Sequence, residues 1–251
     1  MRRERNNFNI WPTFTDIMMG MVFLLLLVAM AFIVDQKDKI ISEKISELKM
    51  ELANSILEGV DEQRAAVKYA DSNSQTNEIL VRFKSDSLFD EGQYALKHDY
   101  QQILVQVAKV LERDPTYHEI IVEGHTDDQP YHSSRGNWGL SADRAISVVK
   151  LFQESTSISL NILSPRGYAD TQHPDTSSLS ESDRALWIEF TDFMSEGPLW
   201  KKRRSGEWWD QLSEDQRELI SMGSKLMRRV DIRIKYNPDS IWYDISGQKQ
   251  Q

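Results

Sequence analysis

The hydrophobic pattern divides the chain into an apolar N-terminal run and a longer region with apolar residues at helix or strand spacing. The run from Ile10 to Val34 holds one charged residue, Asp16, and the polar sequence DQKDK follows at once. As a helix rising about 1.5 Å per residue it would reach about 37 Å, which exceeds a bilayer hydrocarbon of about 30 Å. The pattern predicts a transmembrane helix over residues 10–34, preceded by a short segment over residues 1–9.

Asp16 is the residue of this run that could carry chemistry. A carboxylate within a membrane costs several kcal/mol unless it is protonated, paired or in contact with water, which makes Asp16 a candidate for ion translocation. The alternative is an interfacial position, because Pro12 favours a helix start and Asp16 could reach the surface beside Trp11. Thr13 and Thr15 offer oxygens for Na⁺ but are equally compatible with proton transfer, so both ions stay open.

Charge and composition narrow the location of the chain. Three arginines in the first five residues favour a cytoplasmic N-terminus, which places the sequence after Val34 outside the cytoplasm. The net charge of −9 argues against a nucleic-acid surface, and the lack of cysteine excludes disulfides and a lipidated cysteine. Ala29-Met30-Ala31 resembles a signal-peptidase site, but the apolar run continues past it and favours a retained anchor.

Residues 35–77 are predicted to form a helical connector. The apolar residues with 4-3-4 helical spacing are Ile41, Ile45, Leu48 and Leu52. They could form the seam of a short coiled coil, but Ser55 and Gly59 occupy the next seam positions, so an ordinary amphipathic helix is as good an interpretation. The polar residues 71–75 are predicted to be a linker.

Residues 78–240 are predicted to form one domain in which strands and helices interleave, followed by a tail over residues 241–251. Alternating apolar residues predict strands over 79–83, 120–122 and 230–234, with a strand or loop over 161–168. Helical spacing predicts helices over 91–111 and over 140–152, and Ser141 is placed to cap the second one.

A long polar insertion, about residues 170–226, interrupts this domain. We expect it to fold partly into helices, one of them over 213–226, because structureless loops of this length are unusual. Its tryptophans are expected to pack the insertion onto the domain rather than to form a partner surface. The basic run over 201–204 is interpreted as a solvated surface.

Residues 123–145 read EGHTDDQPYHSSRGNWGLSADRA and carry a recognisable motif. The elements that resemble the peptidoglycan-binding domain shared by OmpA and the flagellar protein MotB are Gly124-His125-Thr126-Asp127, Asn137-Trp138, Leu140-Ser141 and Arg144-Ala145. Two later segments, Gly167-Tyr168 and Arg228-Arg229-Val230-Asp231-Ile232, resemble the later signature of the same family. The family has Asn at the position that Met227 occupies in this chain. The resemblance implies an α+β sandwich of the OmpA C-terminal type over residues 79–236, apart from the insertion.

The resemblance also implies which residues bind the cell wall. The ligand in that family is the stem peptide of peptidoglycan, whose diaminopimelate carries an ammonium and a carboxylate. Asp127 would bind the ammonium, and Arg144 would hold the carboxylate with two parallel hydrogen bonds. The remaining implied residues are Thr126 and Asn137 in the polar lining, Leu140 against the aliphatic stem, and Arg229 as support from the last strand.

His125 and Asp127 by themselves indicate neither a metal site nor a catalytic dyad. No nucleophile motif or further ligand cluster accompanies them in the sequence. We therefore predict no metal, no cofactor and no enzymatic activity.

An apolar helix with Asp16, a helical connector and a wall-binding domain resemble the layout of MotB-type stator subunits. The resemblance implies a homodimer within a ring of multi-span MotA-like subunits in the bacterial inner membrane. The domain would lie in the periplasm, with no direct nucleic-acid partner.

The surroundings of Asp16 and the insertion look more like ZorB of the Zorya anti-phage systems, whose multi-span partner is ZorA-like. We therefore favour an ion-conducting, wall-anchored motor subunit of a Zorya-like complex, with a flagellar MotB-type subunit as the alternative. A passive wall-binding membrane tether and a cleaved, secreted wall-binding protein are the other hypotheses.

Overall fold

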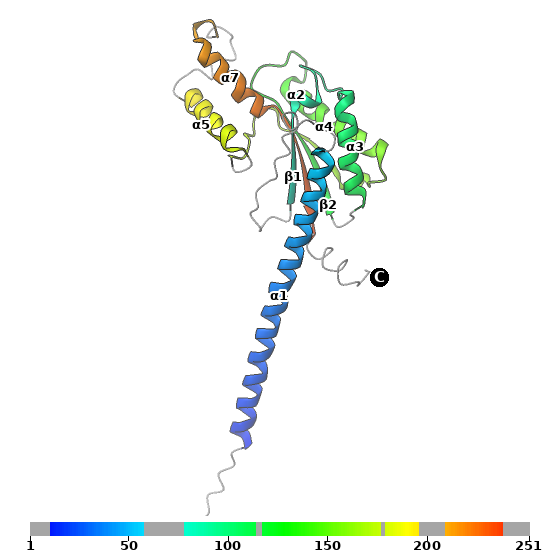
Figure 1. Cartoon of the computed structure of the whole chain (residues 1–251), viewed down its shortest axis with the longest axis vertical. Helices are drawn as coiled ribbons and strands as arrows, with labels where there is room; N and C mark the ends of the chain where they lie inside the picture. The colour runs from blue at the N-terminus through cyan, green and yellow to red at the C-terminus, as the bar shows by residue number, and fades with distance from the viewer. Residues whose placement is uncertain (1–10, 58–77, 114–116, 177–178, 196–208, 238–251) are drawn as a thin grey trace, which may run out of the picture. The chain divides into compact units, whose positions relative to one another are not determined.

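The computed structural model describes residues 11–57, 78–113, 117–176, 179–195 and 209–237. By its internal packing the chain divides between Lys44 and Ile45 into two units, and the long helix α1 continues across this boundary (Figure 1). The first unit is helical where it is described, and the second contains the mixed domain that the sequence predicts.

The first helix, α1, runs from Trp11 to Leu57. Its large apolar side chains from Phe14 to Val34 are exposed on all sides, a surface that suits a membrane span better than a soluble helix, which has one apolar stripe. Within the described part of the chain, α1 is the one helix that is long and apolar enough to cross a membrane.

The last turns of α1 belong to the second unit. Ile45, Leu48 and Leu52 are buried there, and Glu51 approaches Arg113 with an N–O distance of 3.5 Å. Within the second unit, this part of the predicted stripe forms the buried face of an amphipathic helix. The predicted linker over 71–75 lies outside the described residues.

A four-stranded mixed sheet forms the centre of the second unit. Its strands are β1 (Glu78–Lys84), β2 (Tyr117–His125), β3 (Leu163–Gly167) and β4 (Arg229–Tyr236). They lie in the order β1-β4-β2-β3, with β4 antiparallel to β1 and β2, and with β2 parallel to β3. The final strand is thus inserted between the first two.

Helices cover the sheet and form the insertion. They are α2 (Ser85–Leu88), α3 (His98–Arg113), α4 (Gly136–Ser155), α5 (Glu181–Ser195) and α7 (Glu214–Met227), with 3₁₀ turns η1 (Leu160–Ile162) and η3 (Trp209–Gln211). The helix α4 packs on β2 and β3, α3 packs beside α4, and α5 packs against α7 (Figure 1). The predicted fold class, an apolar helix and helical region followed by an α+β domain with a helical insertion, is confirmed.

Two predicted helix starts are wrong. The helix expected from residue 91 begins at His98, because residues 91–97 form turns in which the Lys97 N–H donates to the Leu88 carbonyl at 2.8 Å. The helix expected from residue 140 begins at Gly136, so Ser141 lies inside it and is not its cap. The Ser141 hydroxyl instead accepts the N–H of Ala169 at 3.1 Å, a tertiary contact that local sequence does not reveal.

The insertion has a small apolar core of its own. Leu179, Trp187, Phe190 and Met227 are its buried members. The helix α7 begins at a capping box, in which the Ser213 hydroxyl accepts the N–H of Gln216 and the Gln216 side chain accepts the N–H of Ser213. Trp187 is buried in the core of the insertion itself rather than against the domain, and Trp209 is exposed. Trp200, Trp208 and the basic run lie outside the described residues.

The two faces of the sheet differ in chemistry. Val122, Ile232 and Val81 lie side by side on neighbouring strands and are at most 1% exposed. Gly124 shares their face and abuts the backbone of Ser141, where a Cβ would collide, so this apolar face is the one that α4 covers.

The opposite face carries buried charges. Arg82, Asp231 and Glu123 are aligned across β1, β4 and β2, and Asp231 is fully buried. Arg82 donates to both oxygens of Asp231, at 2.7 and 2.8 Å, and Arg229 donates to one of them at 3.1 Å. Burial raises the pKa of Asp231, but these guanidinium groups outweigh it and lower the pKa to about 2.

Asp231→Asn should strongly destabilise the domain, because it leaves the buried charges of Arg82 and Arg229 without their counter-ion. We expect a loss of about 3–5 kcal/mol in the free energy of unfolding, measured by thermal or denaturant unfolding of the full chain in detergent. The exposed Asp192 provides the matched control, Asp192→Asn.

Since the pKa of Asp231 is depressed, its contribution to the free energy of unfolding is present above about pH 4 and should be lost as the pH falls toward 2. Equal unfolding curves for the two variants would contradict this role.

Candidate functional site

A pocket of about 560 Å³ lies where the end of β2, the start of α4 and the loop after β1 meet. Its lining contains charges of both signs. The charged lining residues are Asp86, Asp90, Glu91, Lys97, Asp127, Arg144 and Arg228. A pocket of this kind suits a small ligand that itself carries both an ammonium and a carboxylate.

Thr126 and Asp127 enter the pocket because β2 ends directly before them. The Thr126 N–H donates to the carbonyl of Ala169 at 2.8 Å, and Ala169 has a φ of 49°, which is unusual for a residue with a side chain. The Thr126 hydroxyl is buried and has no hydrogen-bond partner among the described residues. A buried polar atom of this kind costs free energy until a ligand or water satisfies it.

Asn137 holds the loop that follows Asp127. Its amide nitrogen donates to the carbonyls of Asp127 and Gln129 at 3.0 and 2.9 Å, and its amide oxygen accepts the N–H of Tyr131 at 3.0 Å. These three bonds connect the first turn of α4 to the wall of the pocket. Asn137 therefore shapes the pocket as well as lining it.

Arg144 is buried and ties the loop after β1 to α4. Its guanidinium donates to the Gln93 carbonyl at 2.8 Å and to the Ser85 hydroxyl at 2.9 Å, and it lies 5.1 Å from the centre of the Phe89 ring. Burial lowers the pKa of Arg144, and the carboxylates of Asp86 and Asp127 oppose that effect. Arg144 thus lines the pocket while part of its donor capacity holds the protein backbone.

Arg228 bridges two carboxylates across the pocket. It donates to both oxygens of Asp86, at 3.1 and 3.0 Å, and to Asp127 at 2.7 Å. Burial lowers the pKa of Arg228, but its bonds to Asp86 and Asp127 raise it well above the ordinary value. The carboxylate expected to bind a ligand ammonium is therefore already paired with a guanidinium.

The structure brings five of the predicted site residues together. The predicted residues that line the pocket are Thr126, Asp127, Asn137, Leu140 and Arg144. Arg229 does not line it, and its guanidinium is bonded to Asp231 and to the carbonyls of Met227, Gln172 and His173.

Arg228 lines the pocket, although the resemblance assigned the supporting role to Arg229. The alternation of residues along the last strand indicates which of the two arginines faces the pocket. Val230, Ile232 and Ile234 form the apolar face, so Arg228 falls on the side of α4 and Arg229 on the opposite side.

Asp16, the other predicted functional residue, lies in the first unit of the chain. It is exposed in the second turn of α1. Gly20 follows one turn later on the same face of the helix, and the space beside its backbone is open. Small residues of this kind allow another helix to approach closely in a membrane.

Comparison with known proteins identifies an OmpA-like domain. The model of the OmpA family matches residues 88–186, which contain most of the pocket lining. Bacillus subtilis YtxE is 32% identical over 96 residues, covering 38% of this chain and 39% of YtxE. The LafU protein of Escherichia coli K12, named as a truncated flagellar export/assembly protein, is 32% identical over 81 residues, covering 31% of this chain and 37% of LafU. The chain thus matches less than half of the length of these relatives.

A solved structure supports the same fold. The crystal structure of a protein described as MotB-like, from Desulfovibrio vulgaris, aligns with a TM-score of 0.54 and 15% sequence identity. The alignment covers 80% of this chain and 99% of that protein. The chain therefore has an OmpA-like domain with the fold of a MotB-like protein.

Asn137→Ala should loosen the pocket wall without unfolding the domain. Removing the side chain leaves two carbonyls and one N–H without their partner, which we expect to cost about 1–3 kcal/mol. Hydrogen exchange at the Tyr131 amide should become at least about tenfold faster, because this amide loses its acceptor. Asn161→Ala, at an exposed position in η1, provides the control. Unchanged exchange at Tyr131 would show that Asn137 does not hold this loop.

Proposed function

We propose that this chain is a peptidoglycan-anchored, ion-conducting stator-type subunit of an ion-driven motor in the bacterial inner membrane. The observation that carries the proposal is a pocket with opposed charges in an OmpA-like domain, on a chain whose membrane-length apolar run holds a single carboxylate, Asp16. The N-terminus is proposed to be cytoplasmic and the domain periplasmic.

The pocket is proposed to bind the diaminopimelate of the peptidoglycan stem peptide. Asp127 would take the ligand ammonium, and a ligand carboxylate would lie against Arg144 and Arg228. The ligand would compete with the pair between Arg228 and Asp127, exchanging one internal ion pair for two ion pairs with the ligand. The unsatisfied Thr126 hydroxyl would gain a partner in the complex.

The membrane helix is proposed to carry the ion at Asp16. Loading a cation onto the carboxylate removes a charge that is costly to hold within lipid, and this changes how the helix packs on its neighbours. The open surface at Gly20 would let a multi-span MotA-like or ZorA-like partner approach the carboxylate. We propose two copies of the chain in each motor, and the ion is a proton or Na⁺.

A Zorya-like anti-phage complex is the proposed setting, and a flagellar motor is the alternative. The sequence around Asp16 and the helical insertion support the first. The match to LafU, a protein named for flagellar export/assembly, supports the second. A passive tether would keep the wall-binding pocket but would not need the carboxylate.

Asp127→Ala should weaken binding to purified peptidoglycan by about tenfold or more, because it removes a charged hydrogen bond to the ligand. The measurement is co-sedimentation of the full chain, in detergent, with sacculi that contain diaminopimelate. Asp143→Ala is the matched control. Asp143 lies on α4 and is ion-paired with Arg135, but it does not line the pocket. Sacculi with lysine in place of diaminopimelate should bind more weakly, because the second carboxylate is missing. Equal binding by both variants would place the wall contact elsewhere.

Asp16→Asn should abolish ion flux and leave membrane insertion unchanged, because the amide cannot be protonated or bind a cation as a carboxylate does. Flux is measured in vesicles that contain the multi-span partner, and insertion by resistance to alkaline extraction. Asp35→Asn is the control, since Asp35 lies just beyond the apolar run and is paired with Lys39.

Retained flux in the Asp16→Asn variant would favour the passive tether. A loss of phage protection with normal swimming would support the Zorya-like setting, and the reverse would support the flagellar one.

A further inference from the structure

His125 is a buried titratable group that neither wall binding nor ion passage uses. It is the last residue of β2 and is 1% exposed. Its ring stacks on Tyr168, with the ring centres 5.4 Å apart. Among the described residues, neither ring nitrogen has a hydrogen-bond partner. Burying an imidazole without hydrogen-bond partners costs free energy, so the position of His125 needs a physical reason.

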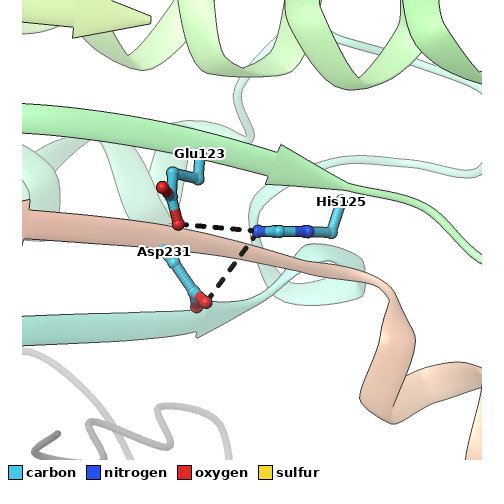
Figure 2. Close-up of side chains that lie close together, drawn as sticks. All are labelled: Glu123, His125 and Asp231. Atoms are coloured by element: carbon cyan, nitrogen blue, oxygen red, sulfur yellow. Dashed lines mark ion pairs between the residues drawn. The ribbon is translucent and has the colours of Figure 1, made fainter. Parts of the chain in front are cut away.

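Two carboxylates face one nitrogen of this ring. Figure 2 shows Nε2 of His125 directed between Glu123 and Asp231, 3.9 Å from an oxygen of each. These distances are too long for hydrogen bonds but suit weak attraction between charges. A small movement of the ring would bring a protonated nitrogen into bonding distance.

The three side chains have the composition of a metal site, but their surroundings do not suit a metal ion. The Asp231 oxygen nearest His125 already accepts from Arg82 and Arg229, and the nearest Glu123 oxygen accepts from Arg233 at 2.7 Å. A divalent cation would compete with three guanidinium groups for the same oxygens. Protonation of the imidazole, in contrast, displaces no guanidinium group from these oxygens.

Charged groups of both signs surround the ring of His125. The charged and titratable groups that face it are Glu123 of β2, Arg229 and Asp231 of β4, and Tyr168 after β3. Arg82 and Arg233 are paired with these carboxylates, Glu78 is paired with Arg233, and Arg166 interacts with Tyr168 and Glu123. Burial lowers the pKa of His125 below its ordinary value, as does the charge of Arg229, although Glu123 and Asp231 oppose both effects.

The position of His125 connects this network with the pocket. Thr126 and Asp127 follow it directly, and the turn that carries Tyr168 is hydrogen-bonded to the end of β2. The Tyr168 N–H donates to the Gly124 carbonyl at 3.0 Å, and the Thr126 N–H donates to the Ala169 carbonyl at 2.8 Å. A movement of the ring toward the carboxylates therefore disturbs the backbone that presents Thr126 and Asp127.

We infer that His125 is a proton site that regulates wall binding, so that protonation of its ring at acid pH disturbs the end of β2 and weakens the hold on peptidoglycan. This inference rests on the proposed function of the pocket. By linkage, ligand binding should in turn make His125 harder to protonate. A periplasmic domain with this property would release the wall when the surroundings become acidic.

The test is co-sedimentation of the full chain in detergent with sacculi between pH 7.5 and pH 5, comparing wild type, His125→Gln and His118→Gln. His118 is an exposed histidine of the same strand and provides the matched control. Wild type and His118→Gln should bind progressively more weakly as His125 takes up its proton, by up to about tenfold per pH unit for one linked proton. The lowered pKa of His125 places this weakening below about pH 6.5. His125→Gln should change less than about twofold, since the amide does not titrate. Equal acid weakening in His125→Gln and wild type, or a flat wild-type profile, would overturn the inference.

Thermal unfolding separates this inference from the proposed function. An unfolded histidine takes up a proton near pH 6.5 and the buried one does so less readily, so wild type should lose stability below that pH. His125→Gln should lose less. If no variant binds sacculi at pH 7.5, the proposed function fails, and coincident melting profiles would then overturn the proton site as well. If His125→Gln does not fold, His125→Phe replaces it, because phenylalanine keeps the stack on Tyr168 and cannot titrate.

Discussion

Asp231 lies on β4, between β1 and β2, and its carboxylate ties β4 to β1 through a buried ion pair with Arg82. Arg82 from β1 and Arg229 from β4 donate to it, and His125 of β2 lies 3.9 Å away. A buried carboxylate is stable only while its partners are in place, so a shift of β1 would leave a charge uncompensated. On the other side of β4, Arg233 donates to Glu123 of β2 at 2.7 Å. The register of these strands sets where β2 ends and where β4 begins, and these two points carry Asp127 and Arg228 into the pocket.

The insertion supports the pocket indirectly, through the residue that follows it. Met227 ends α7 and belongs to the small core of the insertion, and Arg228 follows it before β4 begins. Packing of α7 on α5 therefore helps to set the position of the guanidinium that pairs with Asp86 and Asp127. An insertion that is polar in sequence thus supports the guanidinium group that is paired with Asp127.

Much of this arrangement follows from local sequence. The apolar run around Asp16 specifies a membrane-length helix, and alternating residues specify strands such as 79–83 and 230–234. Ser213 and Gln216 mark the start of α7 by a capping box. The motif residues after β2 and in α4 were predicted as one site because the resemblance supplies the long-range link that periodicity lacks. For the helices and strands, the deciding signal comes from residues within a few positions of one another.

Only the tertiary structure decided which charges meet. Arg228 and Arg229 are adjacent and chemically identical, yet one lines the pocket and the other lies in the buried network, because strand pairing sets which face each residue occupies. Ser141 reads locally as a helix cap but lies inside α4, where it accepts from Ala169. The partners of His125 come from positions about 100 residues apart along the chain. Local sequence specifies helices, strands and residue types, whereas burial and long-range pairing determine which charges are neutralised and which remain available to a ligand.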